Sequence, residues 1–143
     1  MPYQSSRIGP ILLVRFTERL DATDCLALPE EARVACERGR EPVSMVAIVT
    51  ADLSVPSAHE REAFARAALA MRRSCRVIYV AIEGAGFGRA TITSVFSGLT
   101  VYPGQPPITM HASGEAALRA LATALVTDPV SILRTARFQG MIL

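Results

Sequence analysis

The chain has 143 residues, half of them hydrophobic, and a formal net charge of +2. This length suits one domain, and the weak, dispersed charge argues against a nucleic-acid-binding surface. All 15 basic residues are arginine, which excludes a Walker-type phosphate lysine, a Schiff-base lysine and a lysine general base.

The three cysteines and the apolar runs limit the setting in which the chain works. Cys25, Cys36 and Cys75 form no C-x-x-C pair, so neither a disulfide framework nor a zinc ribbon is expected. No apolar run approaches the roughly 20 residues that span a bilayer, and the first residues do not resemble a signal peptide. We therefore expect a cytoplasmic protein with reduced thiols and no membrane contact.

The first half of the chain predicts two strands and a helix between them. Residues 1–7 are polar and are expected to be frayed, whereas the apolar run 8–16 predicts the first strand. Residues 21–39 predict a helix in which Pro29 should cause a kink or begin a second helix. The β-branched run Val43–Thr50 predicts a central strand that is buried on both faces.

The second half of the chain also predicts helices and strands in alternation. Ser57 and Glu60 have the spacing of a capping box and predict a helix over 57–74. Further strands are expected at 77–82 and 108–111, and each is followed by a helix with an apolar stripe. Ser113 is expected to cap the last of these helices, and the sequence Asp128-Pro129 to end it. The tail 130–143 reads as a short amphipathic segment.

This βαβαβαβα order predicts an α/β fold. We expect one small domain with a sheet of about four mostly parallel, or mixed, strands and flanking helices, because parallel strands need such crossovers. The domain is predicted to cover residues 1–127, and residues 128–143 to form a C-terminal amphipathic tail.

The stretch 84–89 has the composition of a binding turn. It reads Gly-Ala-Gly-Phe-Gly-Arg between a predicted strand and helix, so its backbone N–H groups and Arg89 could bind an anion. Its spacing is GxGxG and not the GxGxxG of dinucleotide-binding folds. A looser phosphate site and a plain flexible turn both remain open.

The usual catalytic groups do not form a recognisable set. His59 and His111 have no ligand-spaced partners, no serine lies in a G-x-S-x-G motif, and no carboxylate pair suits acid–base work. We expect no enzyme activity, no metal and no cofactor. Ligands and partners of open α/β sheets meet the carboxyl ends of the strands, which places any functional surface near residues 50–57 and 83–89.

Several segments between residues 46 and 122 resemble the STAS-like, or anti-sigma-factor-antagonist-like, family. The run 46–54 (VAIVTADLS) looks like the central strand of that family followed by its small polar loop, and the capped helix at Ser57 comes next. The runs 76–84 (RVIYVAIEG), 95–102 (VFSGLTVY) and 108–121 (ITMHASGEAALRAL) resemble the segments that follow. The resemblance covers slightly more than half of the chain.

The resemblance implies a bacterial regulatory domain that binds a signalling protein and is switched by phosphorylation at the start of the helix that Ser57 begins. The family's Asp-Ser pair reads Pro56-Ser57 here, and the glycine that follows it in the family is absent. This departure favours a divergent interaction module. The expected partner-binding residues are Asp52, Ser57, His59, Glu60, Gly86, Phe87 and Arg89.

Two other interpretations remain open. The apolar end of the tail could pack on a second copy of the chain and make a homodimer, or it could pack on the chain's own core. The residues proposed for self-association are Phe138, Met141, Ile142 and Leu143. The third interpretation is a small-ligand or phosphate binder that uses the turn 84–89.

Overall fold

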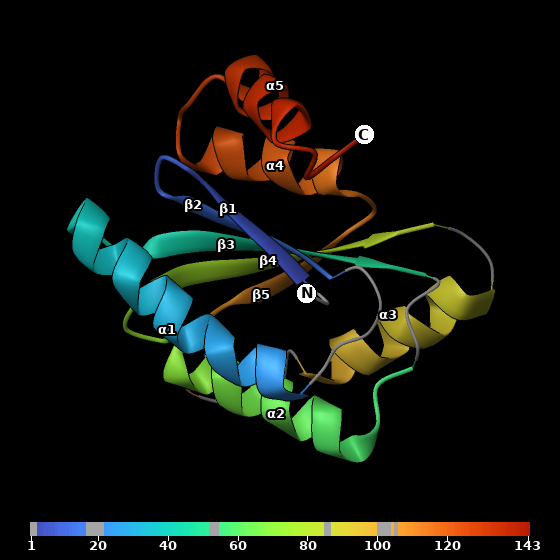
Figure 1. Cartoon of the computed structure of the whole chain (residues 1–143). Helices are drawn as coiled ribbons and strands as arrows, with labels where there is room; N and C mark the ends of the chain where they lie inside the picture. Colours follow the sequence, from blue (N-terminus) through green and yellow to red (C-terminus); the bar gives the residue numbers. More distant parts are fainter. Residues whose placement is uncertain (1–2, 17–21, 52–54, 85–86, 100–103, 105) are drawn as a thin grey trace.

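The computed structural model describes residues 3–16, 22–51, 55–84, 87–99, 104 and 106–143 (Figure 1). In chain order the elements are β1 (Tyr3–Ile8), β2 (Ile11–Phe16), α1 (Ala22–Gly39), β3 (Val43–Thr50), α2 (Ala58–Ala70), β4 (Cys75–Glu83), α3 (Phe87–Leu99), β5 (Ile108–His111), α4 (Gly114–Ala124) and α5 (Pro129–Phe138).

Over the described residues, the strands form one mixed sheet in the order β1-β2-β3-β4-β5. Strand β1 pairs antiparallel with β2, and every other neighbouring pair is parallel. Because β2 to β5 follow one another in space as in sequence, right-handed crossovers place α1, α2 and α3 on one face. Helices α4 and α5 cover the opposite face (Figure 1). The predicted α/β fold is confirmed.

The amino-terminal prediction was wrong. Residues 3–8 are not frayed but form the edge strand β1, and the run 8–16 is interrupted by a turn at Gly9, whose φ is +57°. The antiparallel register aligns Tyr3 with Phe16, and their rings lie 5.9 Å apart. An edge strand keeps polar side chains on its exposed positions, so β1 lacks the apolar alternation that identifies a strand.

Helix α1 continues through Pro29, so the expected start of a second helix at this proline is wrong. Proline removes one backbone donor and crowds the preceding turn. The helix nevertheless persists because one face of it is buried against the sheet. Cys25 and Leu28 before the proline, and Ala32 and Ala35 after it, are all buried.

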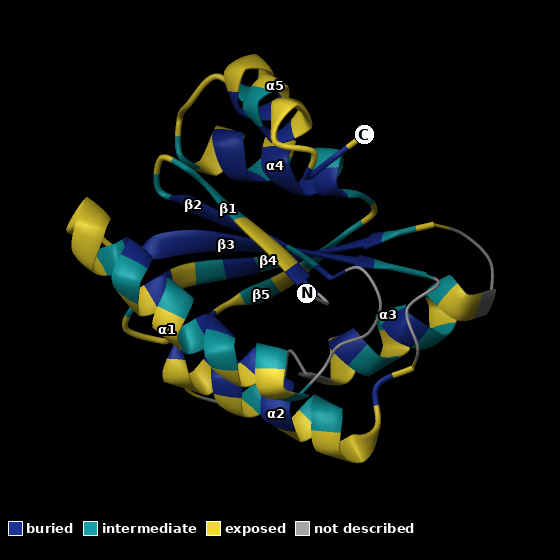
Figure 2. Ribbon diagram, in the orientation of Figure 1, coloured by how far each residue is buried: buried dark blue, intermediate teal, exposed yellow. Residues whose placement is uncertain are grey.

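The sheet separates two apolar cores (Figure 2). The larger core lies under α1, α2 and α3 and contains an edge-to-face pair, Phe64 and Phe96, with centroids 5.3 Å apart. The smaller core lies under α4 and α5 and includes Leu118 and Leu121 of the predicted apolar stripe. Strand β3 is buried on both faces, as its continuous apolar sequence predicts.

The tail is part of the second core, not an appendage. Asp128 caps α5, with its carboxylate accepting a hydrogen bond from the Val130 N–H at 3.1 Å. Met141 and Ile142 are buried in the core shared with α4. Of the two alternatives left open for the tail, Met141 and Ile142 thus pack on the chain's own core and are not available to a second copy. Phe138 and Leu143 alone among the four residues proposed for self-association stay exposed, at 92% and 101%.

The thiols should differ sharply in reactivity. Cys25 and Cys75 are buried, and Cys36 is of intermediate exposure. Burial raises the pKa of the Cys75 thiol to about 12, which suppresses the reactive thiolate at neutral pH. We expect a thiol reagent at neutral pH to label Cys36 first in the native protein and the other two only after unfolding. Mass spectrometry of the labelled peptides would show the order, and early labelling of Cys75 would contradict it.

Candidate functional site

The carboxyl ends of the parallel strands form the candidate site, which we call the carboxyl edge. It comprises residues 50–51 after β3, residues 83–84 after β4, residues 111–113 after β5, and the first turn of α2. Open α/β sheets bind ligands and partners at this edge. Figure 1 shows that α2 and α3 both begin there.

The first turn of α2 is held by a complete capping box. The Oγ of Ser57 accepts a hydrogen bond from the Glu60 N–H at 3.2 Å, and Glu60 Oε1 accepts one from the Ser57 N–H at 2.9 Å. The capping prediction is therefore confirmed, although the helix ends at Ala70, before the predicted residue 74. Val55, Ser57 and His59 are exposed, so this turn presents side chains that nothing in the described structure covers.

Two glycines of the turn after β4, Gly84 and Gly88, are explained by close packing. Gly84 has a φ of +103°, and a Cβ on it would lie 2.9 Å from the Cβ of Ala51. A Cβ on Gly88 would lie 2.8 Å from the Ala51 carbonyl oxygen. The Ala51 N–H donates to the Glu83 carbonyl at 2.7 Å. These residues are thus packed against the end of β3, which accounts for Gly84 and Gly88 without a ligand.

Arg89 joins the ends of neighbouring strands. Its Nη1 donates to the carbonyl oxygens of Ile82, of Gly84 at 2.9 Å and of Ala112 at 3.3 Å. Ile82 lies at the end of β4, Gly84 just after it and Ala112 just after β5, so the guanidinium ties the two strand ends together. The geometry favours a structural role for Arg89 over the predicted contact with a partner or an anion.

The structure does not describe every predicted site residue. Asp52 and Gly86 lie outside the described residues, as does the side chain of Phe87, the first residue of α3. The structure therefore brings together Ser57, His59 and Glu60 on one helical turn.

An ionic cluster that the sequence does not predict lies at this edge, on the side of the sheet that α4 covers. Arg15 Nη1 contacts Glu83 Oε1 at 2.9 Å and the Met141 carbonyl at 3.1 Å. The other Glu83 oxygen accepts the Gly114 N–H at the start of α4, at 3.2 Å. Two features of the sequence point to this cluster: Arg15 is a lone charge inside an apolar run, and Glu83 ends another apolar run. The cluster fixes α4 and the tail to the sheet.

Histidine 111 ends β5 and stacks on Tyr79, with ring centroids 4.6 Å apart. Its Nε2 lies 2.9 Å from Thr109 Oγ1. Partial burial lowers the pKa of His111 below its ordinary value of 6.5, because a low-dielectric environment disfavours the charged ring. These contacts give His111 a structural role at the end of β5.

Acidification should weaken the fold through His111. Since its pKa is lower in the folded state, the unfolded chain binds the proton more readily, and the stabilisation held above about pH 6.5 is lost as the pH falls below it. We expect His111→Asn to reduce the difference in unfolding free energy measured between about pH 7.5 and about pH 5. An unchanged difference in urea melts would contradict this role.

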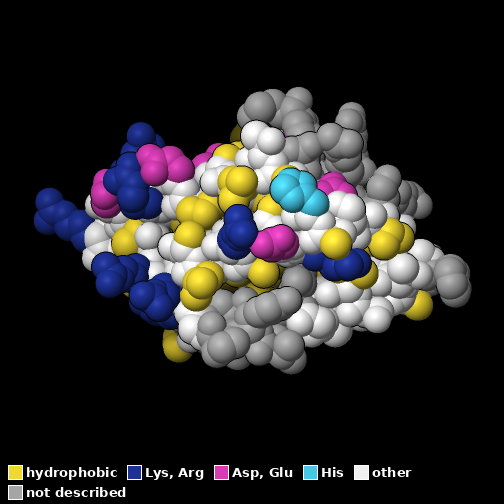
Figure 3. Space-filling model, turned by 90° about the horizontal axis from the view of Figure 1, so that it is seen from below, with side chains coloured by type: hydrophobic (Ala, Val, Ile, Leu, Met, Phe, Trp, Pro, Cys, Tyr) yellow, Lys and Arg dark blue, Asp and Glu magenta, His cyan; other side chains and the backbone are white. Residues whose placement is uncertain are grey.

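The opposite, amino edge of the sheet carries cations. Figure 3 shows arginine side chains gathered where α1 and α2 end. A cavity of about 540 Å³ at this edge is lined in part by Arg72, Arg73 and Arg76. Cations at the carboxyl-terminal end of a helix complement its dipole, so the described structure accounts for this charge without a ligand.

Among the residues that the structure describes, no three His, Cys, Asp or Glu side chains are grouped as a metal site would require. None of their helices is long and apolar enough to cross a bilayer.

Comparison with known proteins found no match among family models, curated proteins or solved structures. The resemblance to the STAS-like family therefore depends on the sequence segments quoted above.

Proposed function

We propose that this chain is a cytoplasmic, non-catalytic regulatory or scaffold domain that binds a signalling protein through the first turn of α2. The observation that carries the proposal is the exposed, fully capped start of this helix, with Val55, Ser57 and His59 presented to solvent. An exposed apolar side chain beside polar ones suits a small docking surface. The resemblance to a divergent STAS-like domain supports the same turn.

Ser57 is the residue through which this surface would be switched. Its hydroxyl is exposed at a helix amino terminus, where the dipole favours added negative charge. The Glu60 carboxylate already occupies the neighbouring Ser57 N–H at 2.9 Å. A phosphate on Ser57 would repel that carboxylate and change the shape and the charge of the docking turn together.

Site-specific crosslinking in cells tests the docking surface. A photoreactive amino acid placed at His59, on the exposed turn, should yield a crosslinked partner. The same group placed at Arg134, which is exposed on α5, should not. Equal yields of the same product from both positions, or none from His59, would contradict the proposal.

Self-association through the tail is a second candidate, favoured by the exposed side chains of Phe138 and Leu143. Deleting residues 128–143 would also remove part of the core, so a surface substitution is the better probe. If these side chains join two copies into a homodimer, Phe138→Ser should convert a dimer to a monomer in light scattering. A wild-type monomer, or a dimer unchanged by the substitution, would exclude this candidate.

A further inference from the structure

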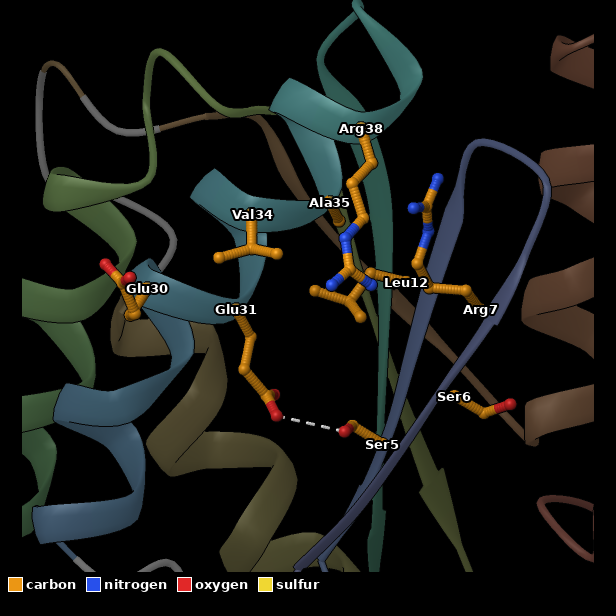
Figure 4. A pocket seen from close by; sticks show the side chains of 9 residues that line it. All are labelled: Ser5, Ser6, Arg7, Leu12, Glu30, Glu31, Val34, Ala35 and Arg38. Carbon is orange, nitrogen blue, oxygen red and sulfur yellow. Dashed lines mark hydrogen bonds between the residues drawn. The ribbon is translucent and has the colours of Figure 1, made fainter.

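A cavity of about 330 Å³ lies between β1 and α1, on the face opposite α4 and α5 (Figure 4). We call it the α1–β1 cavity. Its volume falls at the lower end of small-molecule sites, which combine an apolar floor with a few convergent polar groups. The lining includes the apolar side chains of Leu12, Val34 and Ala35.

The repeat of the helix and the repeat of the strand explain why charged side chains meet in the α1–β1 cavity. Glu31, Val34, Ala35 and Arg38 have the i, i+3, i+4, i+7 spacing of one helical stripe. On β1, Ser5 and Arg7 are two residues apart and so share a face, while the hydroxyl of Ser6 between them donates to Gln139, just after α5, on the other side. The strand and the helix thus each bring a cation and an oxygen-bearing group to the cavity.

The opposite charges occupy different parts of the cavity. Figure 4 shows the Arg38 guanidinium directed back toward Leu12, and the Glu31 carboxylate directed to Ser5 at the other end. Ser5 Oγ donates to Glu31 Oε1 at 3.0 Å. Within the part of the chain that the structure describes, Arg38 forms no ion pair, although carboxylates lie on the same helix.

Two polar atoms of the cavity are buried without a hydrogen-bond partner of normal geometry: Arg7 Nε and Glu31 Oε2. The hydroxyl of Tyr3 adjoins the glutamate, and burial together with the Glu31 and Asp24 carboxylates raises the pKa of Tyr3. A buried donor or acceptor that lacks a partner lowers the stability of the fold. One donor on a cation and one acceptor on a carboxylate are the features that a zwitterion would satisfy.

We propose that the α1–β1 cavity binds a small zwitterionic α-amino acid with an apolar side chain. Arg7 and Arg38 would bind its carboxylate by charge-assisted hydrogen bonds, Glu31 would accept from its ammonium group, and Leu12 and Val34 would contact its side chain. This site is independent of the proposed docking turn of α2, and neither proposal depends on the other.

Calorimetric titration of the full chain with L-leucine, L-valine and L-methionine tests this proposal. At about 10 mM ligand, a site with a Kd of about 1 mM or tighter is detected. We expect at least one of these amino acids to bind. N-acetyl-leucine, which lacks the ammonium group, and leucinamide, which lacks the carboxylate, should each bind at least tenfold more weakly than leucine. No binding by any of the three, or equal binding of the blocked forms, overturns the proposal.

Two substitutions locate the binding. Arg38→Gln and Glu31→Gln should each weaken binding at least tenfold. Arg134→Gln, on an exposed face of α5, serves as the matched control and should leave binding unchanged. Circular dichroism checks that each variant is folded, and Arg38 is the safer probe because the described fold does not use its guanidinium. Full affinity in folded Arg38→Gln would place the ligand elsewhere and refute the assignment.

Discussion

Replacing Gly84 with alanine should lower the free energy of unfolding by about 2–3 kcal/mol, from two causes that act together. The backbone at Gly84 has a φ of +103°, where an L side chain is strained. The new Cβ would also meet the Ala51 Cβ at 2.9 Å. Urea unfolding of the variant measures the loss through the shift in midpoint.

Gly98 is the matched control for this prediction. It lies within α3, and a Cβ there would meet nothing within 4 Å. Because glycine is a poorer helix former than alanine, Gly98→Ala should raise the free energy of unfolding by up to about 1 kcal/mol. If both substitutions shift the midpoint alike, the turn after β4 is not packed on β3 as described.

Replacing Glu83 with leucine should cost about 2 kcal/mol of folding stability. The side chains of Glu83 and Arg15 are 21% and 19% exposed, so removing the carboxylate leaves a largely buried guanidinium without its counter-charge. The Gly114 N–H at the start of α4 also loses its acceptor. Urea unfolding again reports the change, and hydrogen exchange should show α4 opening more readily.

A double-mutant cycle separates the charge effect from the packing effect. Arg15→Leu with Glu83→Leu removes both charges, and an apolar pair in place of a buried ion pair is often close to neutral. The double variant should therefore be more stable than Glu83→Leu alone, with a coupling of about 1 kcal/mol or more. Simple additivity would mean that Arg15 and Glu83 do not act as a pair.

The sequence predicts the parts of this fold that depend on local chemistry. The continuous β-branched run gives β3, and the spacing of Ser57 and Glu60 gives the start of α2, because a capping box is a contact within four residues. Such features can be read from the sequence because they depend on residues that are close together in the chain.

The features that the sequence does not reveal depend on distant residues. Strand β1 is stabilised by pairing with β2 and carries few apolar residues of its own. Arg15 and Glu83 are 68 positions apart, and their pairing follows from the alignment of β2 and β4 through β3. The sequence left open whether Met141 and Ile142 pack on a second copy or on the chain's own core, because nothing local shows that α5 folds them onto α4.

The candidate site was predicted only in part. The exposed first turn of α2 lies where the sequence places it, at the carboxyl edge. Arg89 looked like an anion ligand because arginine after glycine suits that role, but its guanidinium donates to carbonyl oxygens at the ends of β4 and β5. The α1–β1 cavity was not anticipated, since β1, which forms one of its walls and brings Arg7 to it, is a strand that the sequence did not predict.

The proposed function is tested most directly by a quantitative pull-down that changes only the charge at Ser57. Aspartate and asparagine are both good helix caps, so Ser57→Asp adds a negative charge, and Ser57→Asn is its neutral match. From native lysate, wild type and Ser57→Asn should retain the same signalling protein, and Ser57→Asp should retain at least tenfold less of it. Equal retention by all three forms, or capture of self-copies alone, would contradict a charge-switched docking turn at α2.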